Sequence, residues 1–186
     1  MIGDLQRRKA SHYFDLIDED DNGFIEAHDF ELRAERMADA RNLTDEDARA
    51  TLRDRVMRWW DHLCTIADFD DDDRVTREEW ETYWHSIQAG VDEGGDGDNK
   101  TLRSLKRAAR GTFRAIRKGD GAITEDEFAE WLAAWGVDES EAAFNRLDRN
   151  DTGALTEPNL IEAVKEFYLS NDPDAPGNAL YGVLSR

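Results

Sequence analysis

Residues 18–29 read DEDDNGFIEAHD, and residues 68–79 read DFDDDDRVTREE. In each stretch, oxygen-bearing side chains stand at positions 1, 3 and 5, position 8 is aliphatic, and position 12 is a carboxylate. Residues 116–127 and 148–159 fit the same frame less completely. One unit therefore recurs along the chain, and this repeat decides the fold.

Each copy of the repeat consists of an amphipathic segment, a polar loop of about 12 residues and a second amphipathic segment. After the loop, apolar residues recur at i, i+3, i+4 and i+7, which predicts a helix with one buried stripe. The stripe comprises Trp80, Tyr83, Trp84 and Ile87 after the second loop, and Phe128, Trp131, Leu132 and Trp135 after the third. We expect the position-8 aliphatic residues to join the loops through short antiparallel bridges; they are Ile25, Val75, Ile123 and Leu155. The sequence thus predicts an all-α fold of four helix-loop-helix units in two pairs, forming a compact domain with an apolar interior.

Oxygen ligands at positions 1, 3, 5, 7, 9 and 12 are the pattern of the EF-hand calcium loop. In the first loop these are Asp18, Asp20, Asn22, the carbonyl of Phe24, Glu26 and Asp29. In the second they are Asp68, Asp70, Asp72, the carbonyl of Arg74, Thr76 and Glu79. We therefore predict Ca²⁺ at both loops. The shorter Asp29 at position 12 favours one oxygen over two, so Mg²⁺ can also fit the first loop.

Position 6 of the loop makes a sharp turn, and it is Gly23 in the first loop but Asp73 in the second. Asp tolerates a left-handed backbone better than most residues but less freely than glycine. We expect a cost of about 1 kcal/mol at Asp73, which is small beside the attraction of four carboxylates for a dication.

The third and fourth loops are degraded. Counting back from Gly121 places Ile116 at position 1 and Lys118 at position 3, and an equivalent interpretation is a deletion of one residue. Under either interpretation the third loop lacks acidic side chains at its first ligand positions. We therefore predict that this loop is broken and binds no metal. The fourth has a single charged side-chain ligand, so it is predicted to be a weak metal site; its ligands are Asp148, Asn150, Thr152, the carbonyl of Ala154, Thr156 and Asn159.

The predicted organisation has four parts. Residues 1–91 form an N-terminal pair of loops that both bind metal, and residues 92–100 form an acidic, glycine-rich linker. Residues 101–170 form the C-terminal pair, and residues 171–186 form a tail that packs back on the core. Within the first pair, Asn42 to Thr44 marks a break, with Thr44 and Asp47 as the expected capping pair of the following helix.

Four such loops at these separations, together with the tail segment 171–182, resemble the bacterial calerythrins and the sarcoplasmic calcium-binding proteins of the EF-hand superfamily. The resemblance covers nearly the whole chain. It implies a compact all-α fold with loops paired in two halves, a tail folded against the helices, and a role in calcium buffering or signalling. The family usually keeps a functional third loop, whereas here the second is intact and the third is broken, so the resemblance carries metal only to the first two loops.

Composition excludes other classes of protein. With 24 basic and 43 acidic residues the formal net charge is −19, which disfavours nucleic acid as a partner. The first residues lack the apolar core of a signal peptide, and no apolar run approaches the roughly 20 residues that span a bilayer, so we expect a cytoplasmic protein. Residues 12, 28, 62 and 85 are the four His; they lack zinc-ligand spacing, and no catalytic arrangement is present, so we do not expect an enzyme.

Three functions remain open. A Trp-rich interior and a tail favour a closed cytosolic calcium buffer. The basic segment from Leu102 to Lys118 is either a binding site for an unknown protein target, as in a calcium sensor, or a solvated face that neutralises neighbouring carboxylates. A photoprotein-like binder of a small ligand would use Tyr83, Trp84 and His85, but the chain lacks the terminal Pro of the photoproteins.

Overall fold

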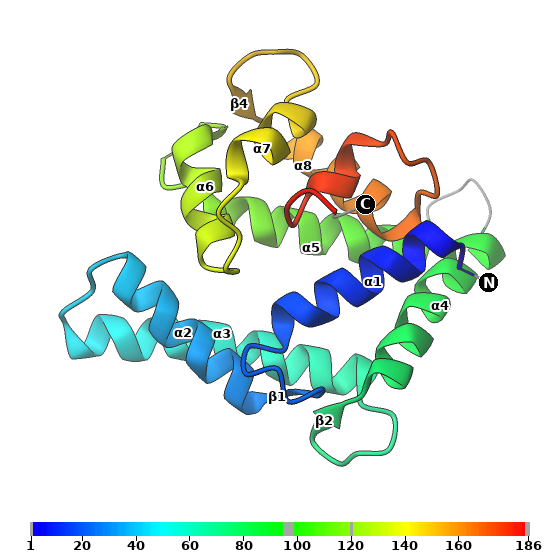
Figure 1. Cartoon of the computed structure of the whole chain (residues 1–186), viewed down its shortest axis with the longest axis horizontal. Coiled ribbons are helices and arrows are strands. Elements are labelled where there is room, and N and C mark those ends of the chain that lie inside the picture. The colour runs from blue at the N-terminus through cyan, green and yellow to red at the C-terminus, as the bar shows by residue number, and fades with distance from the viewer. Residues whose placement is uncertain (1, 95–98, 120, 185–186) are drawn as a thin grey trace. The chain divides into compact units, whose positions relative to one another are not determined.

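The computed structural model describes residues 2–94, 99–119 and 121–184, and helices dominate these ranges (Figure 1). In chain order the elements are α1 (Asp4–Ile17), β1 (Ile25–Glu26), α2 (Ala27–Ala40), α3 (Glu46–Ala67), β2 (Arg74–Val75), α4 (Arg77–Gly94), α5 (Lys100–Ile116), β3 (Ile123–Thr124), α6 (Glu125–Ala133), α7 (Ser140–Leu147), β4 (Ala154–Leu155), α8 (Glu157–Leu169) and the short 3₁₀ helix η1 (Pro176–Ala179). The predicted all-α class is confirmed.

The chain packs as two compact units. One unit is Ala10–Tyr83, and the other consists of the segments on either side of it. Helices α1 and α4 each contribute residues to both units. Of the proposed linker 92–100, residues 95–98 lie outside the described residues, while α4 continues to Gly94 and α5 begins at Lys100. Ser185 and Arg186 of the proposed tail also lie outside them.

In the unit Ala10–Tyr83, strands β1 and β2 pair antiparallel, with Ile25 opposite Val75. Both side chains are fully buried, because each strand turns its aliphatic residue inward from the end of its loop. Around them pack apolar residues of the flanking helices, including Phe14, Ile17, Phe30, Trp60 and Trp80. The short sheet therefore fixes the two loops side by side above one core.

Helix α3 begins one residue later than the sequence predicted. Its N-cap is Asp45, whose side chain accepts a hydrogen bond of 2.8 Å from the backbone N–H of Ala48. The predicted cap at Thr44 is wrong. Asp45 supplies the same capping oxygen and also places a negative charge at the positive end of the helix dipole.

In the other unit, β3 and β4 pair antiparallel with Ile123 opposite Leu155. Helix α5 packs against α8, and η1 packs against α7 and α8. The ring of Tyr181, which follows η1, lies 5.0 Å from that of Phe167. Gly177 approaches α8 so closely that a Cβ there would lie 2.4 Å from the carbonyl oxygen of Ala163, so this position requires glycine.

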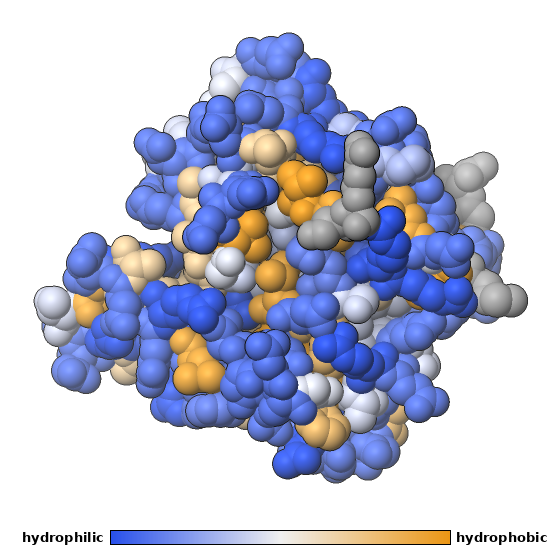
Figure 2. Space-filling model, in the orientation of Figure 1, coloured by the Kyte–Doolittle hydropathy of each residue, from blue (hydrophilic) through white to orange (hydrophobic). Residues whose placement is uncertain are grey.

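The face drawn in Figure 2 is mainly hydrophilic, with hydrophobic residues in small patches. Among the described residues, no helix combines the length and the apolar character needed to cross a bilayer.

Candidate metal-binding loops

The first loop gathers carboxylates from the end of α1 and the start of α2. Asp18, Asp20 and Asp29 each offer an oxygen atom, and these atoms all lie within 4.8 Å of one another. Three oxygens within that separation are at most about 2.8 Å from a common centre, close to calcium–oxygen distances of about 2.3 to 2.6 Å. These three carboxylates can therefore contact one ion, and their hard oxygen donors fit Ca²⁺.

Backbone hydrogen bonds hold these carboxylates in place. Asp18 accepts bonds of 3.0 Å from the N–H groups of Asn22 and Gly23, and Asp29 accepts bonds of 2.8 Å from those of Glu19 and Glu26. Burial raises the pKa of both Asp18 and Asp29, although the hydrogen bonds act in the opposite direction. Two buried carboxylates beside a third are unfavourable alone, so a cation in the loop is favourable.

The side chains of Asn22 and Glu26, also predicted ligands of the first loop, lie outside this three-carboxylate cluster. Asn22 donates a hydrogen bond of 3.2 Å to Glu26 Oε1, and its own Oδ1 accepts one of 2.9 Å from the N–H of Phe24. The other oxygen of Glu26 lies 3.2 Å from Nε of Arg74, whose guanidinium also covers the ring of Phe24. Position 9 of the first loop is thus ion-paired with position 7 of the second.

The second loop brings together Asp68, Asp70 and Glu79, whose oxygens also lie within 4.8 Å of one another. Glu79 accepts hydrogen bonds of 2.9 Å from the N–H groups of Phe69 and Thr76, and the Thr76 hydroxyl donates to it at 2.8 Å. Burial opposes these bonds, but their net effect lowers the pKa of Glu79. The closing carboxylate is therefore held ionised.

Two other acidic residues shape the second loop. Asp72 lies outside the three-carboxylate cluster, with Oδ1 accepting a bond of 3.0 Å from the N–H of Arg74. Asp73 has φ of 61°, in the left-handed region, as its place at the sharp turn requires. Burial together with the charges of Asp72 and Glu79 raises the pKa of Asp70. The loop is strongly anionic without metal.

Cys64 lies beside the second loop. The sequence pattern did not identify this cysteine as part of the site. Its thiol donates to Asp68 at 3.3 Å, and Cys64, Asp68 and Asp73 form a further group of potential ligands. The signal available in the sequence was the four-residue spacing of Cys64 and Asp68 along one helix face. Burial and the neighbouring Asp68 raise the pKa of the thiol to about 11. A protonated thiol is a poor ligand for a hard cation, so the oxygen cluster suits Ca²⁺ better.

The third loop is one residue shorter than the first two. Glu127 accepts bonds of 2.7 Å from the N–H of Lys118 and 2.8 Å from that of Thr124. The first of these donors lies nine residues before Glu127, whereas the corresponding donors in the first two loops lie ten residues before Asp29 and Glu79. Arg117 consequently occupies the place directly after the helix, where the first two loops have Asp. Asp120 lies outside the described residues.

The fourth loop keeps the shape of the first two with less charge. Asp148 accepts bonds of 3.2 Å and 2.6 Å from the N–H groups of Thr152 and Gly153, and the Thr152 hydroxyl lies 3.4 Å from Asn150 Oδ1 and 3.1 Å from the carbonyl of Ala154. At position 12, Asn159 accepts a bond of 2.9 Å from the N–H of Thr156. A neutral amide thus fills the place of the closing carboxylate.

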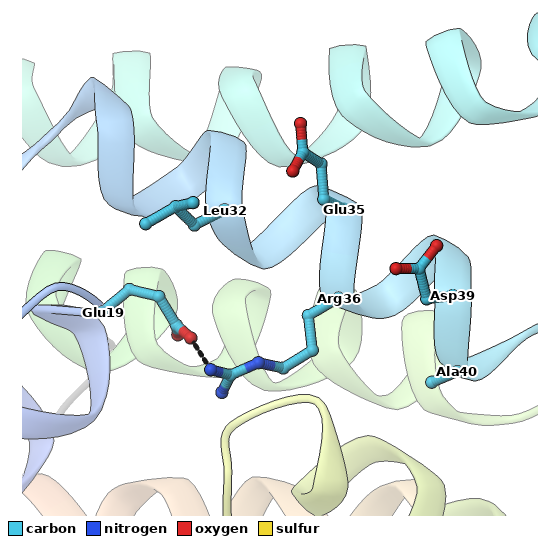
Figure 3. Close-up of a pocket in the computed structure, with 6 residues that line it drawn as sticks. All are labelled: Glu19, Leu32, Glu35, Arg36, Asp39 and Ala40. Atoms are coloured by element: carbon cyan, nitrogen blue, oxygen red, sulfur yellow. Dashed lines mark ion pairs between the residues drawn. The ribbon is translucent and has the colours of Figure 1, made fainter.

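A buried ion pair beside the first loop was also missed by sequence patterns. The side chain of Arg33 in α2 is 2% exposed, and its Nη2 lies 3.0 Å from Oε2 of Glu19 and donates to the carbonyl of Leu16. Arg36 pairs with Glu19 as well, at the wall of an open pocket of about 530 Å³ (Figure 3). The sequence did contain a signal for this pair. Arg33 occupies the position in the apolar stripe that is held by Tyr83 after the second loop and by Trp131 after the third.

Comparison with known proteins identifies relatives over most of the chain, although the sequence matches no protein-family model. It is 34% identical to calerythrin from Saccharopolyspora erythraea over 162 residues, which cover 83% of this chain and 87% of calerythrin. A Streptomyces coelicolor calcium-binding protein, described in terms of prokaryotic calcium-mediated regulation, is 27% identical with a TM-score of 0.66, over 88% of this chain and 97% of its own.

The amphioxus sarcoplasmic calcium-binding protein shares the fold, with a TM-score of 0.70 at 21% identity over 98% of both chains. The match to calerythrin covers most of each chain. The chain therefore belongs to the EF-hand calcium-binding proteins of the calerythrin and sarcoplasmic type.

Proposed function

We propose that the chain is a cytosolic calcium buffer that binds two ions, one in each loop of the unit Ala10–Tyr83. The observation that carries the proposal is the convergence of three carboxylates in each of these loops, Asp18, Asp20 and Asp29 in one and Asp68, Asp70 and Glu79 in the other. The calcium-binding relatives support the choice of ion. The other predicted ligands complete each shell from the loop edge.

The two sites are expected to act together. Ile25 and Val75 pair across the sheet, and Glu26 is ion-paired with Arg74. An ion that orders the first loop therefore also orders the strand β2, which belongs to the second loop. The second loop then loses less conformational entropy when it binds its own ion.

Two features support a buffer. A sensor opens its paired helices on binding metal and exposes an apolar surface. Here Arg33 ties the carbonyl of Leu16, near the end of α1, and Glu19 of the loop to α2, so the helices on either side of the first loop are joined independently of metal. In the other unit, the residues from Gly177 to Tyr181 are buried against their own helices.

A calcium-dependent regulator is the second candidate. It is favoured by the relative described in terms of calcium-mediated regulation and by the basic face of α5, described below. The two candidates differ in whether calcium changes the exposed apolar surface.

Calorimetric titration with calcium, with and without millimolar Mg²⁺, tests the number and type of sites. We expect two ions, Mg²⁺ competing at the first loop where Asp29 closes the site, and loss of one ion in each of the variants Asp18→Asn and Asp68→Asn. A single site, or no change in either variant, would refute the assignment.

Fluorescence of an apolar dye separates the buffer from the regulator. A buffer should bind no more dye with calcium than without it, measured on the full chain. A several-fold rise in dye fluorescence on calcium addition would overturn the buffer and support the regulator.

A further inference from the structure

Helix α5 carries a dense block of positive charge. Eight of the 24 Lys and Arg residues lie between residues 100 and 118, a stretch without Asp or Glu. Four arginines recur at intervals of four, three and four residues, so they follow one face of the helix. We call them the cationic row: Arg103, Arg107, Arg110 and Arg114. At a rise of about 1.5 Å per residue, the row is roughly 16 Å long.

The fold leaves the cationic row exposed to solvent. On the opposite face of α5, Leu105, Ala109, Phe113 and Ile116 are buried, and the helix packs against α8. All four arginines of the row are exposed. The apolar face thus anchors the helix and leaves the charged face accessible.

Internal ion pairs use only part of this charge, and one of them joins Lys118 to Glu130 of α6. Arg110 lies 3.0 Å from Glu157 at the start of α8, and its side chain remains 51% exposed. Within the described residues, Lys106, Arg107 and Arg114 form no ion pair. Neutralising neighbouring carboxylates therefore does not account for these three charges.

A strip of small residues runs beside the row. Ser104, Ala108, Gly111 and Ala115 recur at the same intervals and are all exposed. A glycine inside a helix costs about 1 kcal/mol relative to alanine. At Gly111 a Cβ would meet no atom within 4 Å, so the packing of this chain does not require the glycine. The strip gives an outside backbone a place to approach closely.

We propose that this face of α5 docks an acidic α-helix of a partner protein, with the helix lying on the small-residue strip and its carboxylates facing the cationic row. Carboxylates at three- and four-residue spacing would follow the spacing of the row, and guanidinium groups bind carboxylates through two parallel hydrogen bonds. The inference goes beyond calcium binding and does not depend on it.

The rest of the molecule favours a slender partner. The chain outside this stretch is strongly acidic, and charges are screened over about 8 Å at physiological ionic strength. A helix about 10 Å wide can place its carboxylates beside the row while it covers little of the surrounding acidic surface. A broad anionic surface would face those acidic residues as well.

The chemistry of the strip argues against lipid and nucleic acid. Binding in a membrane interface uses exposed large apolar side chains, and single-stranded nucleic acid stacks its bases on exposed aromatic rings. Among the described residues the exposed large hydrophobic side chains are Phe69 and Val183, and neither is on α5.

The test uses the full chain and a labelled synthetic helical peptide with Glu on one face at three- and four-residue spacing. A peptide of the same composition, with its Glu residues distributed around the helix, is the control. Fluorescence anisotropy at physiological salt should show at least tenfold tighter binding of the first peptide. Equal binding of both peptides, or tighter binding of phosphatidylserine vesicles or oligothymidylate, would overturn the proposal.

Variants separate the surface from overall charge. Arg107→Gln with Arg114→Gln should weaken peptide binding at least tenfold, and Gly111→Leu should weaken it by filling the strip without removing charge. The matched control Arg55→Gln with Arg58→Gln removes the same charge from exposed positions of α3 and should leave binding unchanged. Circular dichroism and the calcium titration verify that each variant is folded. An equal loss in the α3 control would overturn the proposal.

Discussion

The guanidinium of Arg33 lies 3.0 Å from the carboxylate of Glu19, and the two side chains are only 2% and 6% exposed. The backbone N–H of Glu19 in turn donates to Asp29, the closing carboxylate of the first loop. The buried ion pair between α2 and the loop thus holds the donor that positions a predicted metal ligand.

Replacing Arg33 should damage both the fold and the first site. In Arg33→Met the Glu19 carboxylate stays buried with only Arg36 as a partner, and breaking a buried pair costs on the order of 3 kcal/mol. Urea denaturation without calcium measures this loss, and calorimetry should show weaker binding at one site. In the control Arg36→Gln the lost arginine is 47% exposed, so the loss should stay below about 1 kcal/mol. Equal losses in the two variants would contradict the positioning role.

Glu79→Gln tests the closing carboxylate of the second loop. The change keeps the size of the side chain but removes its charge, so the affinity of that site should fall at least tenfold, about 1.4 kcal/mol. Calorimetric titration measures the fall, and the exposed neighbour Glu78, changed to Gln, is the matched control. An unchanged isotherm would mean that the second loop does not bind calcium.

The third loop should remain without metal. Arg117 occupies the place of the first ligand, and the loop is one residue short at its entrance. Glu127→Gln should therefore leave the number of bound ions and their affinities unchanged. A lost ion in this variant, measured by the same titration, would show that the third loop binds metal.

Lys9 should give the stability of the protein a distinctive pH dependence. Its side chain is completely buried, and Nζ donates to the carbonyls of Glu166 at 2.9 Å and Ser170 at 2.7 Å and to Oδ1 of Asn178 at 3.2 Å. Burial lowers the pKa of Lys9 to about 8 from its ordinary value of 10.5, although the charge of Glu166 opposes the shift. As the pH rises through 8, folded Lys9 loses its proton while the unfolded chain keeps one until 10.5, so unfolding takes up a proton.

The free energy of unfolding of the protein, relative to that of Lys9→Met, should consequently rise between pH 8 and 10.5, by up to about 1.4 kcal/mol per pH unit. Below pH 8 the difference should be constant, since the lysine is charged in both states. Thermal denaturation of both proteins across this range measures it. A difference that stays flat above pH 8 would show that Lys9 remains charged in the fold.

Calcium should stabilise the first two loops far more than the last two. Without metal, the carboxylates of two neighbouring loops repel one another, and ions that bind only the folded form add roughly 4 kcal/mol at a thousandfold excess over Kd. Hydrogen exchange should slow on calcium addition in residues 13–87 much more than in residues 113–167. Equal protection in both ranges would indicate one cooperative unit.

Local patterns were enough to predict how the loops pair. The aliphatic residue at position 8 gave the register of Ile25 with Val75, because a strand this short has only one buried side chain to place. The cap of α3 was misplaced by one residue, since Thr44 and Asp45 both have capping side chains. For the third loop two interpretations were open, and the spacing of Lys118 and Glu127 shows that the loop is shorter.

The buried charges could not be predicted in the same way. Arg33 and Lys9 lie on the helix faces that pack inward. Their sequence neighbours show that a charged residue interrupts an apolar face, but they do not show what it pairs with. Their partners are the backbone carbonyls of Leu16, Glu166 and Ser170, which exist as acceptors only where helices end in the folded chain. Such pairs depend on tertiary structure.

The makeup of the two units sets an order of events during synthesis. One unit is continuous, from Ala10 to Tyr83, and its internal contacts need nothing that is made later. The other joins the first residues to the last, since Gln6 donates to the carbonyl of Tyr168 at 3.0 Å and Lys9 reaches Asn178. At about 5 to 20 residues per second, a ribosome needs roughly 5 to 20 s to pass from Tyr83 to Asn178. The unit that contains the first two loops can thus close while the nascent chain is still growing, and Gln6 and Lys9 must wait until Tyr168 and Asn178 have been made.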